Sequence, residues 1–307
     1  MTPRRLLCVL AAVVALVAFS SGARGQETAE YPNGTSGLKA GTVPPPGQYW
    51  LMYNRVYQAS ELRGPNGDVA KGANGEPLGM DVTGYANVHR FLFSTEDKIC
   101  GANYSWNFVI PLVLIDTDIS AYDMHDTEFR FGDINVEPFV IEWHEPRYDF
   151  GFVYGFFAPT AERSDVRASL PGKKCWDNYV GPAGTYYFDE DRKWAISFLS
   201  RYEIPSTRED KDIRPGQNFS FEWGLGRTFE ETTDIGVSGY CSWQTTLDSG
   251  SAVNYTNVLD HVYGIGPEIN YFSTKYKLGY SLRAWWEFGA RDRSQGQIIT
   301  LTLIKPF

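Results

Sequence analysis

Eight charged residues stand where they could act together on a solute. Each belongs to a run in which polar and apolar residues alternate, as Asp133 and Glu137 alternate with Ile134 and Val136. Because successive side chains of a β-strand point to opposite faces, the eight are predicted on the faces that look away from the apolar residues. These candidate lumen-lining residues are Asp133, Glu137, Arg201, Glu203, Glu222, Glu268, Arg283 and Glu287.

Two interpretations of these charges stay open. In the first, they line a polar pathway that selects solutes by charge, and the excess of carboxylates favours cations. In the second, they fill the interior with salt bridges, the carboxylates being neutralised by Arg201 and Arg283. Barrels of up to about ten strands are filled by side chains and those of roughly 16 to 18 leave a channel, so strand number does not decide between the two.

Nucleophilic catalysis has little support in the sequence. No histidine stands in a His-x-Ser context, and no Gly-x-Ser-x-Gly elbow occurs. Glu222 and Glu268 would make an acid–base pair only if folding brought them to a suitable separation. We therefore predict that the protein is not an enzyme, and an outer-membrane lipid hydrolase is the last of three alternatives. The histidines are His89, His125, His144 and His261.

A metal site is not predicted either. Asp116, Asp118, Asp123 and Asp126 lie close together in one polar connection. Carboxylate oxygens bind Ca²⁺, but a solvated acidic loop accounts for the same residues. We expect neither a metal nor a cofactor.

The elements that carry these residues are β-strands. From Tyr276 to Phe288 the even positions are apolar or aromatic and most odd positions are polar or small. In the final run, Ile299, Leu301 and Phe307 share one face. A period of two over so many residues is typical of strands with one apolar and one polar face.

Ten earlier segments show the same alternation, so the chain is predicted to be all-β with about twelve antiparallel strands. Long and short connections alternate, as in an up-and-down outer-membrane barrel with short periplasmic turns and longer outer loops. Closure leaves no unpaired edge in lipid. A soluble β-sandwich would carry more aliphatic residues and fewer Trp and Tyr. The alternation is weakest near His89 and Arg90, and Pro138 indicates a bulge.

The composition agrees with a barrel. The 307 residues include 19 Tyr, 19 Phe and 9 Trp, and the net charge is −9. A mean hydropathy of −0.32 argues against a helical membrane protein. The negative charge argues against nucleic acid as a partner, because a phosphate backbone needs a basic surface.

The N-terminus has the pattern of an export signal. Arg4 and Arg5 precede an apolar run that is too short to span a membrane, and small residues follow it. We predict a signal peptide over residues 1–25, cleaved after Gly25. Residues 26–46 are predicted to be a flexible periplasmic segment, and residues 47–307 the barrel.

Three cysteines follow the predicted signal peptide, namely Cys100, Cys175 and Cys241. Their odd number and irregular spacing do not suggest a disulfide framework. The predicted topology puts Cys100 and Cys175 at opposite ends of the barrel, where they cannot form a bridge. We expect three free thiols.

Several short motifs, in this order, resemble a family of bacterial outer-membrane proteins named for the meta-pathway of phenol degradation. They are Pro45-Pro46-Gly47-Gln48-Tyr49, Phe131-Gly132-Asp133-Ile134-Asn135-Val136-Glu137-Pro138, Ala158-Pro159-Thr160, Gly239-Tyr240 to Gln244, and Gly264-Ile265-Gly266-Pro267-Glu268-Ile269-Asn270-Tyr271. The resemblance implies a barrel of about twelve strands that transports aromatic or hydrophobic compounds. Ala161 and Lys305 depart from the family's pattern.

We therefore expect a barrel in the bacterial outer membrane that passively moves small, hydrophobic or aromatic molecules. A plugged structural or binding barrel is the alternative. The expected partners are outer-membrane lipid, the small-molecule solute and the barrel-insertion machinery, which would bind the C-terminal strand ending in Phe307.

Overall fold

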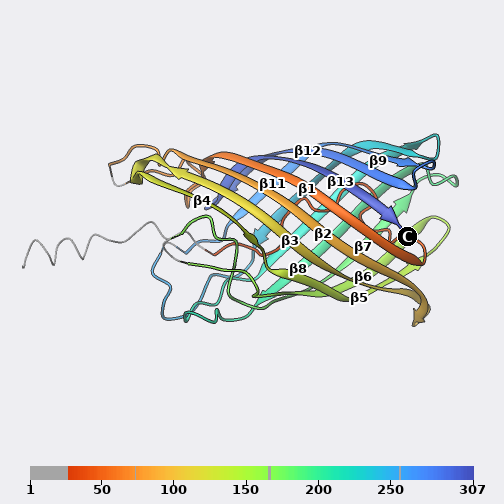
Figure 1. Cartoon of the computed structure of the whole chain (residues 1–307), viewed down its shortest axis with the longest axis horizontal. Coiled ribbons are helices and arrows are strands. Elements are labelled where there is room, and N and C mark those ends of the chain that lie inside the picture. Colours follow the sequence, from red (N-terminus) through yellow and green to blue (C-terminus); the bar gives the residue numbers. More distant parts are fainter. Residues whose placement is uncertain (1–26, 73, 165–166, 256) are drawn as a thin grey trace, which may run out of the picture.

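The strands form one closed antiparallel sheet in the computed structural model, which describes residues 27–72, 74–164, 167–255 and 257–307 (Figure 1). Strands that follow one another in the chain pair, except that β4 and β5 both pair with β3, and pairing of β1 with β13 closes the barrel. The strands are β1 (Gly47–Leu62), β2 (Met80–Ile99), β3 (Ala102–Ile119), β4 (Met124–Phe131), β5 (Ile134–His144), β6 (Tyr148–Ala158), β7 (Asp177–Tyr187), β8 (Trp194–Pro205), β9 (Asn218–Phe229), β10 (Thr233–Gln244), β11 (His261–Ser273), β12 (Leu278–Arg291) and β13 (Ser294–Pro306), with a 3₁₀ turn, η1 (Ser120–Tyr122), before β4.

β4 and β5 are two halves of one barrel strand. β4 pairs with the second half of β3, and β5 pairs with the first half. The pairing is interrupted at Gly132 and Asp133, where the Gly132 N–H donates to the Pro111 carbonyl instead. The barrel is therefore twelve-stranded, which confirms the predicted fold class.

The alternation of side chains separates an apolar outside from a mostly polar inside. Phe150, Ile196 and Ile265 are among many large apolar residues exposed on the outer face. Such a band is what a bilayer covers in a transmembrane barrel. No helix in the described part of the chain is long and apolar enough to span a membrane.

One register differs from the prediction. The pairing of β5 with β6 shifts between Val136 and Phe139, next to Pro138. A bulge of this kind moves all later side chains to the other face. Unbroken alternation from Ile134 and Val136 predicts Val140 on the lipid face, but Val140 points inward and packs on a buried cluster that contains Tyr31 and Tyr179.

The two ends of the barrel differ in their connections (Figure 1). At the long-loop end lie the connections 63–79, 159–176, 206–217 and 245–260; at the short-turn end lie turns such as 100–101 and 145–147. Cys100 lies in a short turn and Cys175 in a long loop, while Cys241 lies on β10. All three are free, as predicted.

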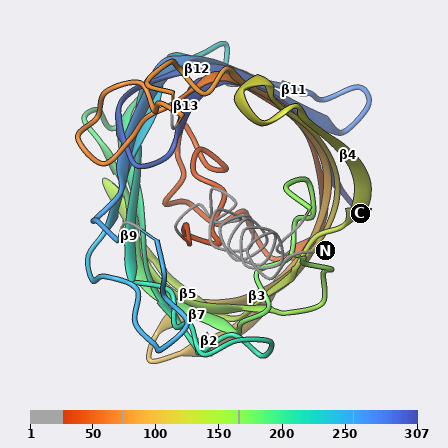
Figure 2. The same cartoon turned by 90° about the vertical axis from the view of Figure 1, so that its left-hand side faces the viewer.

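Residues 27–46, which precede β1, lie inside the barrel (Figure 2). We call them the luminal segment. Glu27 lies near Asp248 in a long loop, whereas Val43 contacts Glu142 near the opposite end. This corrects the prediction of a flexible periplasmic segment for residues 27–46. The predicted signal peptide lies outside the described residues and stays a prediction.

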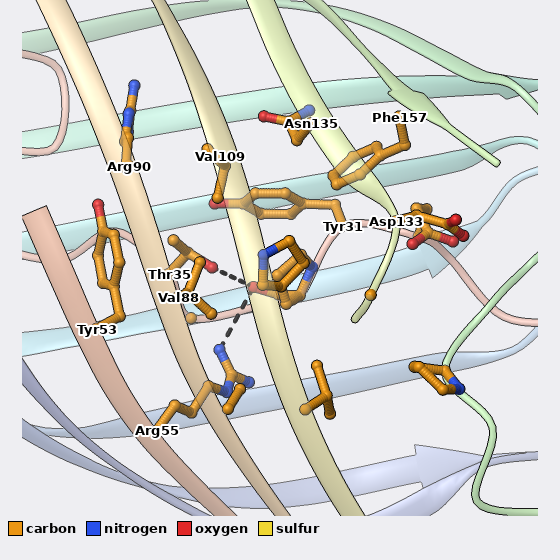
Figure 3. A pocket seen from close by; sticks show the side chains of 18 of the residues that line it. Tyr31, Thr35, Tyr53, Arg55, Val88, Arg90, Val109, Asp133, Asn135 and Phe157 are labelled. Carbon is orange, nitrogen blue, oxygen red and sulfur yellow. Dashed lines mark hydrogen bonds between the residues drawn. The ribbon is translucent and has the colours of Figure 1, made fainter. Parts of the chain in front are cut away.

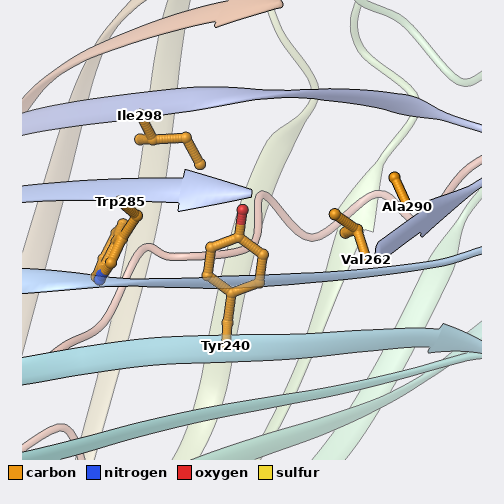
Figure 4. Close-up of a cluster of buried hydrophobic side chains, with 5 residues drawn as sticks. All are labelled: Tyr240, Val262, Trp285, Ala290 and Ile298. Carbon is orange, nitrogen blue, oxygen red and sulfur yellow. The ribbon is translucent and has the colours of Figure 1, made fainter. Parts of the chain in front are cut away.

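Part of the interior is filled by a cluster of apolar side chains (Figure 4). Trp285 is fully buried there, with its ring perpendicular to that of Tyr240 and its indole N–H donating to the Ser238 carbonyl at 2.9 Å. Val262 and Ile298 complete the contact. The inner face of the barrel is thus packed on this side rather than open.

Candidate functional site

Glutamate side chains of the wall hold the luminal segment by its backbone. Glu222 of β9 accepts hydrogen bonds from the N–H groups of Gly34, Thr35 and Ser36 at 2.7, 3.0 and 2.7 Å. Glu203 of β8 accepts those of Glu30 and Tyr31 at 2.9 and 2.8 Å through one oxygen. Hydrogen bonds to a charged acceptor are stronger than neutral ones, so these contacts fix the segment against the wall.

The same arrangement continues along the segment. Glu268 of β11 accepts the Leu38 N–H at 3.0 Å, and Glu142 of β5 accepts that of Val43 at 2.8 Å. Arg283 of β12 donates in the opposite sense, to the Thr35 carbonyl at 2.9 Å. We call the face formed by β8–β12 the carboxylate side of the lumen.

Glycines allow the segment to approach the wall this closely. A Cβ on Gly37 would lie 1.8 Å from a carboxylate oxygen of Glu268, and one on Gly41 would lie 2.2 Å from the backbone of Gly184. A side chain at Gly41 would push the segment off the wall because it would meet backbone, whereas one at Gly37 would displace the Glu268 carboxylate that binds the Leu38 N–H. The glycines of the luminal segment, which are also typical of flexible segments, therefore allow close packing against the wall here.

The inner face of β1–β3 is different, because most of its side chains are apolar. Val88, Val109 and Pro111 line a cavity of about 260 Å³ on this apolar side, and Tyr31 and Pro32 of the luminal segment close it from within (Figure 3). We call it the central cavity. An apolar cavity of this kind with a few polar groups is the usual form of a small-molecule site.

Arg90, Glu137 and Arg201 line both the central cavity and a second cavity of about 160 Å³, the lower cavity. Each arginine donates to one Glu137 oxygen at 2.8 Å. Asn107 and Tyr179 also donate to Glu137, at 2.6 and 2.8 Å. We call Arg90, Glu137 and Arg201 the partition, because they form the boundary that the two cavities share.

The partition is also tied to the luminal segment. The guanidinium carbon of Arg201 lies 4.2 Å from the centre of the Tyr31 ring and 5.3 Å from that of Tyr179. Cation–π contact of this kind is strongest where the groups are buried, as Arg201 is. Movement of Tyr31 would therefore alter both the partition and the central cavity.

Toward the long-loop end, a wider cavity of about 680 Å³ lies among the loops, lined in part by Glu27, Arg163 and Arg208. Both arginines donate to the same Glu27 oxygen at 2.7 Å. These ion pairs connect the start of the luminal segment to two long loops. Each of the three cavities is lined in part by residues of the luminal segment.

The eight predicted residues all face the interior, but they do not act as one group. Glu137 and Arg201 meet in the partition. Asp133 accepts the Ala161 and Lys173 N–H groups at the loop, and Glu287 accepts the hydroxyls of Tyr57 and Tyr240. The other four bind the luminal segment, namely Glu203, Glu222, Glu268 and Arg283.

Sequence analysis missed Glu142, Asp149, Arg55 and Arg90. Glu142 follows the bulge, so unbroken alternation from Glu137 would put it on the outer face, although Pro138 was a signal of that bulge. Arg90 lies on the lumen face of β2 beside Ala86 and Val88, whereas the opposite face carries polar residues such as Asn87. Alternation therefore could not place Arg90. Asp149 accepts a hydrogen bond from Thr42 of the luminal segment at 2.8 Å.

Glu30, on the luminal segment, is buried beside the central cavity. Burial raises the pKa of its carboxyl to about 8, an effect that Asp133 and Glu203 reinforce and Lys173 opposes. At neutral pH this group is therefore mostly uncharged.

The histidines are engaged in structural contacts. His144 lies between Glu142 and Asp149, at 3.0 Å from each, and His89 accepts the Trp50 indole N–H at 3.1 Å. Asp126, one of the clustered aspartates, is paired with Arg167. Among the described residues, no group of three or more Asp, Glu, His or Cys has metal-binding geometry.

A family model described as "Putative MetA-pathway of phenol degradation" matches residues 63–303. The COG4313 outer membrane channel from Pseudomonas putida F1 is similar in structure, with a TM-score of 0.75 and 12% identity over 88% of this chain and 98% of that one. The β domain of the Bordetella autotransporter BrkA has a TM-score of 0.50 and 9% identity over 86% of this chain and 100% of that one. Both similarities show only that the chain has the fold of an outer-membrane barrel. No curated protein sequence matches the chain.

Proposed function

Since the chain belongs to the family described by that model, we propose that it is a passive outer-membrane channel for small apolar molecules. The observation that supports this most is the central cavity, which has an apolar wall inside a mostly polar lumen. A polar solute would gain nothing from Val88, Val109 and Pro111, whereas an apolar one buries surface there. The outer face and the barrel's closure suit a lipid environment.

In this proposal the long-loop end faces outward and the short-turn end faces the periplasm of a bacterial cell. The solute enters among the long loops, rests in the central cavity and leaves past the partition. The last strand, β13, ends at Pro306 and is followed by Phe307, which is 79% exposed. We assign this terminus to recognition by the barrel-insertion machinery.

The proposal does not include catalysis. His144 is held by two carboxylates, and the nearby Thr42 hydroxyl donates to Asp149. A Ser–His nucleophile would instead need the hydroxyl to donate to the imidazole. We accordingly assign the lumen to binding and passage.

Uptake of the apolar dye N-phenyl-1-naphthylamine by cells that produce the protein tests the proposal. The dye fluoresces once it leaves water, and intact outer membrane delays it. Val109→Trp fills the central cavity and is expected to slow uptake to the level of cells without the protein. Val237→Trp is the matched control, because Val237 lies on the exposed outer face.

Both variants must show the heat-modifiable migration of a folded barrel. Equal uptake by the wild type and the Val109→Trp variant would exclude the central cavity from the path. Uptake no faster than in cells lacking the protein would refute the channel itself.

A further inference from the structure

The arginines around the central cavity carry more positive charge than their neighbours neutralise. Arg55, Arg90 and Arg201 all line it. Arg90 and Arg201 share the single carboxylate of Glu137. In the described part of the chain, the only hydrogen bond of the Arg55 side chain is a long one, 3.4 Å from Nη1 to the Pro32 carbonyl (Figure 3).

The other acidic groups of the cavity offset this charge only in part, because Asp133 and Glu137 are two charged carboxylates against three guanidinium groups. Asp133 directs one oxygen to the Ala161 N–H at 2.7 Å and the other to the Lys173 N–H at 3.0 Å. Glu30 is mostly neutral, since burial raises its pKa to about 8. The charge that remains uncompensated beside the apolar wall is therefore positive.

Several donors at the partition also lack acceptors. Nε and Nη1 of Arg201 and Nε of Arg90 are buried without a hydrogen-bond partner. A guanidinium can only donate, so the group missing from this site is an acceptor. Buried polar groups in proteins are nearly always paired, and unpaired ones call for a bound water, ion or ligand.

We propose that the molecules taken up by the central cavity are small apolar compounds that carry one carboxylate. The hydrocarbon part packs on Val88, Val109 and Pro111, and the carboxylate binds Arg55. This inference rests on the proposed channel function and names the substrate class of the same site. A guanidinium suits a carboxylate because both groups are planar and match in two parallel hydrogen bonds.

The partition favours the same class. An anionic group that passes the partition can pair with one of the two arginines while Glu137 stays paired with the other. Each guanidinium group then still has a carboxylate partner. A cation would instead have to draw Glu137 away from both arginines, and uncovering two buried guanidinium groups is unfavourable. The lumen around the cavity therefore selects against cations, contrary to the expectation drawn from the acidic excess.

Three probes of nearly equal shape test the inference on the unmodified full chain: benzoate, neutral benzyl alcohol and cationic benzamidine. We expect isothermal titration calorimetry of the purified barrel to give benzoate an affinity about tenfold above that of benzyl alcohol, equivalent to about 1.4 kcal/mol. Benzamidine should bind weakest. Equal binding of benzoate and benzyl alcohol would overturn the carboxylate preference and leave the apolar channel standing.

Arg55→Gln locates the contact. We expect this variant to bind benzoate about as weakly as benzyl alcohol, with benzyl alcohol binding unchanged. Arg227→Gln is the control, because the exposed Arg227 lies over the rings of Trp194 and Phe229. Unchanged benzoate binding in Arg55→Gln would overturn the assignment of Arg55. The dye-uptake experiment separates the two proposals. Absence of dye uptake would refute the channel, whereas normal dye uptake with equal binding of benzoate and benzyl alcohol would refute only the carboxylate preference.

Discussion

The two sides of the lumen differ in what their side chains contact. On the carboxylate side, β8–β12, charged groups such as Glu203 and Glu222 bind the backbone of the luminal segment. The apolar side, β1–β3, makes few polar contacts with the segment and leaves the central cavity between them. The segment thus lies against one wall, and the space for a solute lies along the other.

This difference changes what the charge of the lumen means. A count of the predicted inward residues suggests a cation-selective interior, but three of the six carboxylates, Glu203, Glu222 and Glu268, accept N–H groups of the segment on the carboxylate side. The central cavity is lined by three arginines, and only two charged carboxylates, Asp133 and Glu137, stand against them because Glu30 is mostly neutral. Selectivity in such a barrel follows from which groups remain unpaired, and not from the sum of charges.

Removal of the luminal segment should give the largest effect. Without residues 27–43, Glu142, Glu203, Glu222 and Glu268 lose their backbone partners and line an open, acidic lumen. We expect single-channel conductance in planar bilayers to rise several-fold and the reversal potential in a salt gradient to show cation selectivity. A folded variant that stays closed, or that prefers anions, would contradict the division of the lumen into two sides.

A smaller effect is expected from Glu222→Ala, which removes the acceptor for three consecutive N–H groups. Loss of these charge-assisted bonds should weaken attachment of the segment by on the order of 3 kcal/mol. Hydrogen–deuterium exchange should then be faster at Gly34, Thr35 and Ser36.

Glu287→Ala is the matched control, because Glu287 is also luminal but binds Tyr57 and Tyr240. If both variants accelerate exchange at these three amides equally, the attachment does not depend on Glu222. In that case the carboxylate side would have no special role in holding the segment.

The sequence predicted the carboxylate side well and the apolar side poorly, for a physical reason. In β12 one face meets lipid and the other meets charge, so alternation separates Leu282 from Arg283. In β2 the lumen face is apolar where Val88 lines the cavity, while the opposite face carries Asn87 and His89, so alternation does not tell the two faces apart. Pro138 indicated a bulge, but only the pairing of β5 with β6 shows which side chains it inverts.

The luminal segment could not be predicted from local sequence at all. Its contacts join residues far apart in the chain, such as Tyr31 and Glu203. Its glycines and prolines have the composition of a flexible linker. Gly41 is needed because the backbone of Gly184 lies where its Cβ would be, and nothing near Gly41 in the sequence reveals this.

The smallest effect concerns pH, through Glu30 of the luminal segment. Burial raises its pKa from 4.5 to about 8 when the segment is in place, and release to water returns it to the ordinary value. The attached state therefore binds more protons, so attachment is strongest below about pH 4.5 and weakens as the pH rises to about 8. The rate of amide exchange at Glu30 and Tyr31 should therefore rise across this pH range. The rate is divided by that of Glu30→Gln at the same pH, because this ratio cancels the intrinsic pH dependence of exchange. If the ratio of exchange rates in the two proteins stays constant with pH, protonation of Glu30 is not coupled to release of the segment. Attachment to the carboxylate side would then depend on Glu203, Glu222 and Glu268 alone.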